Sequence, residues 1–434
     1  MNARLIAAVV CAALAGCSSS AQNIDKSTQY GPDPNLPEPS RALLPRMNVA
    51  KAVGWSAGET PTVPQGFHIE AIATGLANPR NVYPLPNGDL LVIESKKEGK
   101  EPVERPKRVL MGWIEKKAHG GGGGPSNRIL LLHDTNADGK PDSQTVLIDQ
   151  LNAPFGVVLV GDYLYVADTD AILRFAFKPG DTKVGGPAEK VVDLPAGPIN
   201  HHWTKSLTAS PDGSKLYVGV GSNSNVMERG IEAETNRAAI WEVDPASGAY
   251  KVFARGLRNP NGLTFYPGSG TLWTVVNERD ELGPNLVPDY LTSVKPGAFY
   301  GWPYSYWGQH ADARVAPQRP DLVKSAIPPD YGLSSHVAPL GLAFYTGASF
   351  PAQFKGGAFV GEHGSWNRPE PNGYKVVFIR FQDSHPVGEP MDFVTGFIKD
   401  GKARGRPVGV AVDRSGALLV ADDVGNTVWR VSSG

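Results

Sequence analysis

Six short openings of similar form recur along the 434-residue chain, and each introduces short apolar runs. They lie at residues 78–82, 153–157, 202–207, 259–263, 338–342 and 406–410. After most of them, one apolar run leads through a turn rich in Gly, Asn, Asp or Ser into a second. Such turns join antiparallel strands, because Gly and Asn tolerate positive φ. Small repeated sheets cannot bury both faces alone, so the pattern predicts an all-β, six-bladed β-propeller. A hairpin-rich solenoid or a sandwich is the alternative.

The segment 67–73 has the composition of a strand but precedes the first opening, whereas the last repeat ends soon after its third strand. We therefore predict that this N-terminal strand completes the last blade and closes the ring. Such a closure would protect the edges of the sheet.

Composition limits the classes of function. With 41% hydrophobic residues and 50 glycines, the chain can bury a large core and still form many turns. The net charge is -1, with acidic and basic residues spread throughout. This balance excludes a polycationic face for nucleic acid.

The N-terminus has the form of a bacterial lipoprotein signal. A positive start and an apolar run from Leu5 to Ala15 lead into Gly16 and Cys17. We expect residues 1–16 to be the signal peptide and Cys17 to be lipidated, which leaves no cysteine in the mature domain. Ser18 favours the outer membrane, facing the periplasm. An ordinary signal peptide with an incidental cysteine is the alternative.

Residues 17–60 are polar and punctuated by proline, which predicts a flexible tether that connects the lipid anchor to the domain. The folded domain is then expected to span residues 61–434. This organisation places the protein in the cell envelope, in contact with a membrane only through its lipid.

The segment 134–142 alternates oxygen-bearing side chains around a glycine. Its candidate ligands for a structural calcium are Asp134, Asn136, Asp138 and Asp142. The twelfth position is Thr145 and not Glu, so the segment is not an EF-hand. An Asx-rich hairpin turn favours the same residues and is the alternative.

Three ordered motifs, at residues 256–263, 300–303 and 404–406, resemble the signatures of the soluble PQQ-dependent glucose/sorbosone (aldose sugar) dehydrogenases. The resemblance runs from about residue 61 to the C-terminus. It implies a six-bladed propeller that binds pyrroloquinoline quinone (PQQ) and calcium. It also implies oxidation of an aldose at its anomeric carbon by hydride transfer to the quinone, with a periplasmic electron acceptor.

The resemblance assigns the cofactor contacts to cationic side chains. Arg404 and Arg406 would hold the carboxylates of PQQ, since a guanidinium group pairs with a carboxylate through two parallel bonds. Arg258 and Asn259 would lie at the quinone oxygens and stabilise negative charge. Where the family has a further lysine, Arg368 is the preferred match, and Lys375 is the alternative.

His202 matches the general base of the family, nine residues before Pro211. As a neutral imidazole it would take the proton of the anomeric hydroxyl. His201 and His68 fit a structural role better. Because His201 stands where glucose-oxidising members carry an acidic residue, the resemblance does not imply glucose itself.

The resemblance places the catalytic calcium on the backbone carbonyls of Asn277 and Glu278. This loop is shorter than the family pattern and lacks its Gly-Pro. The opposing interpretation is that Asp280 and Glu281 pair with neighbouring cations.

Two other functions stay open. A calcium-dependent lactonase or another propeller hydrolase would use axial Glu, Asn and Asp side chains, for which Glu94, Asn223 and Asp422 are candidates. A non-catalytic propeller that scaffolds envelope proteins is the second. No glycine-rich fingerprint follows a strand and opens a helix, so a nicotinamide dehydrogenase of the Rossmann type has no support.

Overall fold

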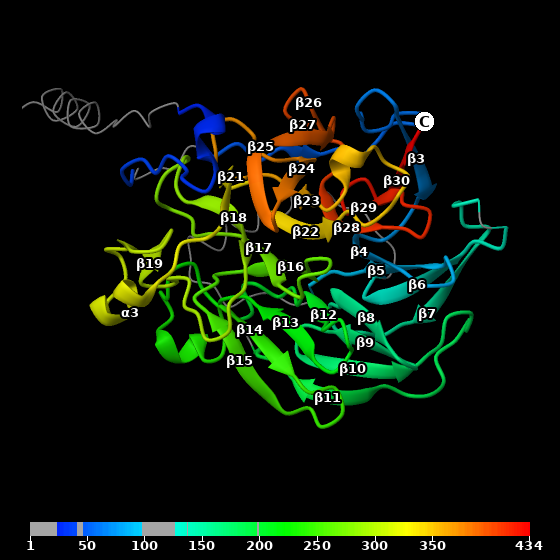
Figure 1. Cartoon of the computed structure of the whole chain (residues 1–434), viewed down its shortest axis with the longest axis horizontal. Helices are drawn as coiled ribbons and strands as arrows, with labels where there is room; N and C mark the ends of the chain where they lie inside the picture. The colour runs from blue at the N-terminus through cyan, green and yellow to red at the C-terminus, as the bar shows by residue number, and fades with distance from the viewer. Residues whose placement is uncertain (1–23, 41–46, 98–125, 137, 198) are drawn as a thin grey trace, which may run out of the picture.

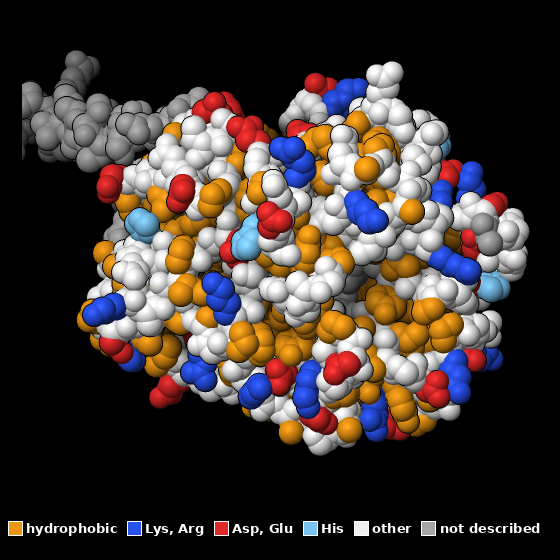
Figure 2. Space-filling view, viewed as in Figure 1, with side chains coloured by type: hydrophobic (Ala, Val, Ile, Leu, Met, Phe, Trp, Pro, Cys, Tyr) orange, Lys and Arg blue, Asp and Glu red, His pale blue; other side chains and the backbone are white. Residues whose placement is uncertain are grey.

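The computed structural model describes residues 24–40, 47–97, 126–136, 138–197 and 199–434, and the regular secondary structure in this part of the chain is almost entirely β-strand (Figure 1). It forms six antiparallel sheets of four or five strands, together with two small sheets. Acidic, basic and apolar side chains are interspersed over the face shown in Figure 2, in keeping with the balanced net charge of the sequence.

The six sheets follow one another along the chain. The first contains β4 (Pro79–Pro84), β5 (Leu90–Glu94), β6 (Arg128–His133) and β7 (Ser143–Ile148), and the second β8 (Gly156–Val160), β9 (Tyr163–Ala167), β10 (Ala171–Ala176) and β11 (Glu189–Asp193). The third contains β12 (Leu207–Ala209), β13 (Leu216–Val220), β14 (Ala239–Val243) and β15 (Tyr250–Arg255). The fourth contains β16 (Pro260–Phe265), β17 (Leu272–Val276), β18 (Pro288–Ser293) and β21 (Tyr331–Ser335), with β1 (Tyr30–Gly31) at its edge.

The last two sheets come mainly from the C-terminal third. The fifth contains β22 (Pro339–Phe344), β23 (Ala358–Glu362), β24 (Lys375–Gln382) and β25 (His385–Val394), and the sixth β28 (Pro407–Val412), β29 (Leu418–Asp422), β30 (Thr427–Ser433) and β3 (Phe67–Ala73). The small sheets consist of β19 (Ser305–Tyr306) with β20 (His310–Ala311), and of β2 (Lys51–Ala52), β26 (Ile398–Lys399) and β27 (Lys402–Ala403). Short helical turns are η1 (Lys26–Gln29), η2 (Ile231–Glu234), α3 (Pro320–Ser325) and η3 (Ala352–Phe354).

Each predicted opening leads into the first strand of a sheet, and these first strands pack against one another. β4 contacts β8, and the contacts continue through β12, β16, β22 and β28 back to β4. The glycines of the openings permit this approach. A Cβ atom on Gly341 would lie 2.2 Å from the carbonyl oxygen of Val408, and one on Gly156 would lie 2.3 Å from the amide nitrogen of Leu207. The recurrence of glycine at this position therefore follows from backbone contact between neighbouring sheets.

The N-terminal strand β3 pairs antiparallel with β30, with Phe67 opposite Ser433 and Ile69 opposite Val431. It is the fourth strand of the last sheet, as the sequence predicts. Its aromatic Phe67 packs edge-on against Phe350 at 4.8 Å between ring centroids and so joins the core that the fifth and sixth sheets share.

The prediction of a free tether over residues 17–60 is wrong for the part that the structure describes. Strand β1 pairs with β21 and β2 pairs with β27. Gln29 is 1% exposed, and its amide donates to the Asn285 carbonyl at 2.7 Å while its oxygen accepts from the Ser335 hydroxyl at 3.0 Å. Polar side chains of this segment thus find partners in the domain, which composition alone does not reveal.

Cys17 and the predicted cleavage site lie outside the described residues. Within the described ranges, no helix combines the length and the apolar character needed to cross a bilayer.

Candidate active site

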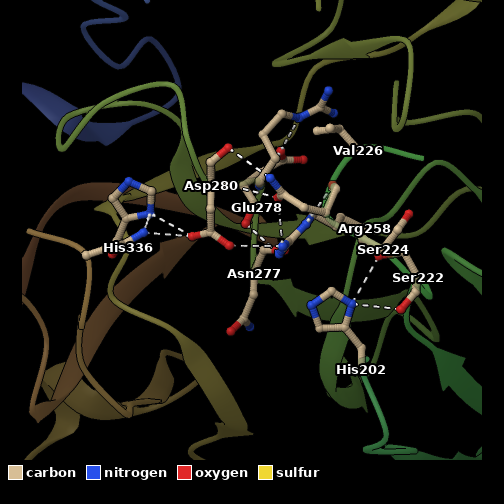
Figure 3. A network of polar contacts seen from close by, with 12 residues as sticks. His202, Ser222, Ser224, Val226, Arg258, Asn277, Glu278, Asp280 and His336 are labelled. Atoms are coloured by element: carbon tan, nitrogen blue, oxygen red, sulfur yellow. Dashed lines mark hydrogen bonds and ion pairs between the residues drawn. The ribbon is translucent and has the colours of Figure 1, made fainter. Parts of the chain in front are cut away.

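His202 lies just before β12 and has one ring nitrogen fixed by its neighbours (Figure 3). Its Nδ1 is 2.8 Å from the carbonyl oxygen of Ser222 and 3.0 Å from that residue's hydroxyl. A carbonyl can only accept, so Nδ1 carries the hydrogen and Nε2 keeps its lone pair. Burial, followed by the nearby Arg258 and His201, lowers the pKa of His202 well below its usual value. The ring is therefore neutral, with Nε2 as its basic atom.

Arg258, at the start of the fourth sheet, is 2% exposed and fully engaged. Its Nη1 donates to the Glu278 carbonyl at 2.7 Å, and its Nη2 donates to Asn225 Oδ1 and to Asp280 Oδ2, each at 3.0 Å. The backbone carbonyl of Arg258 accepts from the Ser222 N–H at 2.7 Å, which ties it to the residue that holds His202. The charge of Arg258 thus lies close enough to lower the pKa of the imidazole.

Asp280 connects Arg258 to two residues that the sequence did not indicate. Asn367 donates to Asp280 Oδ1 at 2.7 Å and to His336 Nδ1 at 3.1 Å. The other nitrogen of His336 donates to the Gly283 carbonyl at 3.1 Å. Burial lowers the pKa of His336, so this ring is also neutral. Because these residues come from separate loops, no local pattern in the sequence could have brought them together.

Asn259 lies beside His202. A Cβ atom on Gly221 would be 2.5 Å from both the Oδ1 of Asn259 and the Cβ of His202, so only glycine fits between them. Asn259 Oδ1 is buried and has no hydrogen-bond partner among the described residues. A buried amide oxygen without a partner is costly, which makes this atom a candidate contact for a bound molecule.

Arg406 is 3% exposed and stacks on Tyr374 with 4.9 Å between its guanidinium carbon and the ring centroid. Its Nη2 donates to the Tyr374 hydroxyl at 2.9 Å, and its Nη1 is 3.5 Å from His363 Nδ1. Within the part of the chain that the structure describes, its Nε has no hydrogen-bond partner. Arg406 therefore retains an unused buried donor, to which a bound anion could hydrogen-bond.

The structure separates Arg404 from Arg406, contrary to the prediction that both hold one ligand. Arg404 donates to the Gly396 carbonyl at 2.7 Å and to the Glu59 carboxylate at 3.1 Å, and it lies over the Trp55 ring at 4.7 Å. None of these contacts involves the residues around His202 or Arg406. Arg404 instead fastens the N-terminal segment to the domain.

Arg368 has partners of its own, but its buried Nε has no hydrogen-bond partner among the described residues. It donates to the Pro284 carbonyl and to Asn285 Oδ1, the latter at 3.0 Å, while its neighbour Asn367 joins the Asp280 network. The alternative residue, Lys375, forms an ion pair with Asp392 at 2.5 Å. Both cations thus have partners outside the network around Arg258.

The carbonyls predicted to hold the catalytic calcium face a cation. Both Asn277 and Glu278 accept from Nη1 of Arg258, at 3.3 and 2.7 Å. A calcium ion on the same oxygens would meet the guanidinium group, so these carbonyls do not fit a calcium ion in the arrangement observed. The opposing interpretation, in which Asp280 pairs with a cation, describes the loop correctly.

The segment 134–142 is an Asx-rich turn between β6 and β7. The N–H groups of Gly139 and Lys140 donate to Asp134 and Asp138 at 2.7 Å each, and that of Thr135 donates to Asp142 at 2.8 Å. Asn136 accepts from the Asp138 N–H at 2.9 Å. In the described residues, no three His, Cys, Asp or Glu side chains are grouped to hold a metal ion. The described residues of this segment therefore form the Asx-rich turn.

The candidate lactonase residues are each engaged by different partners. Glu94 is paired with Arg128, and Asp422 accepts from the indoles of Trp55 and Trp429 at 2.7 and 3.1 Å. Asn223 accepts from the His201 N–H at 3.3 Å. These three side chains therefore do not converge on one metal ion.

The sequence also contains a Gly-x-Ser-x-Gly string at residues 54–58, and such a string marks the nucleophile of many hydrolases. A nucleophile elbow requires a strand before it and a helix after it. Ser56 lies instead in an exposed turn, where its N–H donates to Glu59 at 3.2 Å. The string is not an elbow.

Comparisons with known proteins show what the chain resembles. Residues 167–366 match the model of the glucose/sorbosone dehydrogenase family, and residues 322–434 match a TrAA12-like model. An uncharacterised protein of Borreliella burgdorferi is 29% identical over 294 residues, which cover 65% of this chain and 76% of that protein. A PQQ-dependent pyranose dehydrogenase of Coprinopsis cinerea is 24% identical over 369 residues, which cover 74% of this chain but 45% of the length of that enzyme.

Two solved structures share the fold at 20% identity. The holo form of the Coprinopsis cinerea pyranose dehydrogenase PQQ domain has a TM-score of 0.69 and covers 88% of this chain and 100% of that domain. A calcium structure of a Trichoderma reesei family AA12 enzyme has a TM-score of 0.68 and covers 86% of this chain and 97% of that one. The chain therefore shares its fold with these two proteins. The part of the chain that resembles the glucose/sorbosone dehydrogenase family model is residues 167–366, which is less than half of the 434 residues.

Proposed function

We propose that this protein oxidises the anomeric carbon of an aldose, or a related sugar aldehyde or alcohol, with PQQ as the electron acceptor. The observation that carries this proposal is the neutral His202, whose Nδ1 is fixed by Ser222 and whose Nε2 keeps its lone pair. It lies close to Arg258 and beside the amide oxygen of Asn259, which has no partner among the described residues.

The donors present suit the proposed cofactor. PQQ carries three carboxylates and an ortho-quinone, so it requires buried cations as well as polar groups at the quinone. Arg406 has a buried Nε and Asn259 a buried oxygen that no described residue uses. These two side chains would contact the cofactor, while Arg258, already paired with Asp280, would act on the quinone mainly through its field.

When bound, PQQ supplies a two-electron oxidant that accepts the hydride from the sugar. The chain's own contribution is to accept one proton from the sugar and to hold the ring of the base in a fixed orientation. Nε2 of His202 takes the proton of the anomeric hydroxyl, and Ser222 keeps the ring in the required orientation and tautomer. Loss of the proton from the anomeric hydroxyl and of a hydride from the anomeric carbon converts a cyclic aldose into its lactone.

Calcium enters the proposal because the Trichoderma relative is described as a calcium structure. The carbonyls of Asn277 and Glu278 do not fit this role while Arg258 bonds to them. Calcium is therefore included in the reconstitution without assigned ligands.

We further infer that the six sheets are the blades of a six-bladed β-propeller that β3 closes. The order of contacts among the first strands and the pairing of β3 with β30 support this arrangement. The lipobox at Cys17 supports a lipid-anchored protein of the bacterial envelope, and Ser18 favours the periplasmic side of the outer membrane. Electrons would then pass to a periplasmic acceptor.

The test is reconstitution of purified apoprotein with PQQ and Ca²⁺, followed by dye reduction with a panel of aldoses. His202→Ala is expected to keep PQQ affinity and to lower kcat by about two to four orders of magnitude. His68→Ala, at an exposed position on β3, is the matched control and should leave kcat unchanged. Absence of PQQ binding at micromolar concentration would exclude the dehydrogenase, and metal-dependent lactone hydrolysis without PQQ would favour the lactonase.

A further inference from the structure

Arg80, in the first of the six openings, is a buried cation that no step of the proposed function uses. It is 7% exposed and forms an ion pair with Asp423 through Nη1. Its guanidinium carbon lies 5.5 Å from the ring centroid of Trp203 and 5.9 Å from that of Phe155. Trp203 follows His202 directly in the sequence, so Arg80 lies over the ring of the residue after the candidate base. Its Nε finds no hydrogen-bond partner in the described ranges.

Asp423 and His363 connect Arg80 to Arg406. His363 Nε2 is 3.0 Å from both carboxylate oxygens of Asp423, so this nitrogen donates and Nδ1 is left as an acceptor. Nη1 of Arg406 lies 3.5 Å from that Nδ1. One carboxylate and one imidazole therefore orient both guanidinium groups.

The charges of these four residues do not cancel. Burial is the main cause that lowers the pKa of His363 to about 4, so the imidazole is neutral near pH 7. Asp423 forms its ion pair with Arg80, while Arg406 donates to the Tyr374 hydroxyl. Each guanidinium also retains a buried Nε that bonds to no described residue. Leaving these buried donors unused is costly, and a bound anion that accepts from them would remove this cost.

We propose that Arg80 and Arg406 together form a carboxylate-binding site beside Trp203, oriented by the Asp423–His363 pair. The inference rests on the proposed function, because the carboxylate would belong either to PQQ or to an acidic sugar substrate. A planar guanidinium group suits a carboxylate, and two of them on one anion give both affinity and orientation. The first opening would then contribute to binding alongside the last.

The test compares the wild-type apoprotein with Arg80→Met, which keeps the stem over Trp203 but removes the charge, and with Arg80→Lys, which keeps the charge. PQQ binding is measured by isothermal titration. Arg80→Met is expected to raise the Kd about 10- to 100-fold, as loss of a charged hydrogen bond predicts, and Arg80→Lys to restore part of the affinity. Arg174→Met is the matched control, because Arg174 also lies over an aromatic ring, that of Tyr163, but on the outer part of the second sheet.

A second measurement uses benzene-1,3,5-tricarboxylate as a probe and follows the melting temperature. The wild type is expected to be stabilised by the probe and Arg80→Met is not. If Arg80→Met fails to fold, the double variant Arg80→Met/Asp423→Asn is used in its place, because it removes both buried charges of the ion pair. An unchanged Kd with a raised KM for glucuronate but not for glucose would assign the carboxylate to the substrate.

The outcomes separate the two proposals. If the wild type does not bind PQQ, the proposed function fails, and the carboxylate site is then judged by the tricarboxylate alone. If the wild type binds PQQ, but Arg80→Met changes neither PQQ affinity, probe stabilisation nor the KM for glucuronate, the carboxylate site is refuted while the dehydrogenase stands.

Discussion

Replacing Arg404 and Arg406 separately by methionine tests two different predictions for the role of Arg404, one from the sequence motif and one from its contacts in the structure. The motif predicts that both hold the cofactor, whereas the structure binds Arg404 to Gly396, Glu59 and Trp55. The Arg404–Glu59 pair is partly exposed, with side chains 15% and 34% accessible, so its contribution is at most about 1 kcal/mol. The stacking on Trp55 adds about 0.5–1 kcal/mol. Arg404→Met should therefore lower stability by up to roughly 2 kcal/mol without changing PQQ affinity.

Arg406→Met should behave in the opposite way. Loss of a charged hydrogen bond to a carboxylate of about 1.5–3 kcal/mol corresponds to a roughly 10- to 100-fold higher Kd for PQQ. The assay is titration of each apoprotein with PQQ, together with denaturant unfolding without the cofactor. If Arg404→Met weakens PQQ binding as strongly as Arg406→Met does, the contacts of Arg404 with the N-terminal segment do not persist in the holoprotein, and the two arginines do not have separate roles.

Three further predictions concern titration and the N-terminal segment. His363 has a pKa of about 4 in the folded protein against 6.5 for an ordinary histidine, so the unfolded chain binds the extra proton and stability falls as the pH drops from 6.5 to 4. His363→Gln should remove on the order of 3 kcal/mol of this loss, and equal pH dependence of urea unfolding in both proteins would contradict it. The acid limb of kcat should lie below pH 6.5, because burial lowers the pKa of the base His202 and the rate falls only when that base is protonated; a limb at or above 6.5 would argue against His202. Gln29→Ala should cost about 1–3 kcal/mol by leaving buried partners at Asn285 and Ser335 unbonded, whereas the exposed Thr28→Ala should not, as melting curves would show.

The repeat pattern predicted the order of the sheets because it depends on local features. Turn glycines such as Gly88 and Gly213 have φ of 105° and 70°, so their positions mark the hairpins directly. The unpaired strand 67–73 and the short last repeat likewise indicated the pairing of β3 with β30. Both inferences needed only the order of strands along the chain.

Side-chain directions were less predictable. Arg404 and Arg406 would share a face if they stood in a regular strand, but β28 begins only at Pro407. In the irregular segment before it, tertiary contacts decide where each guanidinium points. The same holds for Arg258, which bonds to the carbonyls assigned to calcium, and for Asn367 and His336, which reach Asp280 from separate loops.

The packing of the N-terminal segment has a practical consequence for anyone who trims the gene for expression. A version that starts at residue 61 would lose Trp55, whose indole donates to Asp422, the carboxylate that also accepts the backbone N–H of Arg406 at 2.8 Å. Water would then reach an acid whose pKa burial now raises to about 6. Such a trimmed protein would be expected to be less stable and to load its cofactor poorly, and the fault would be mistaken for a missing activity.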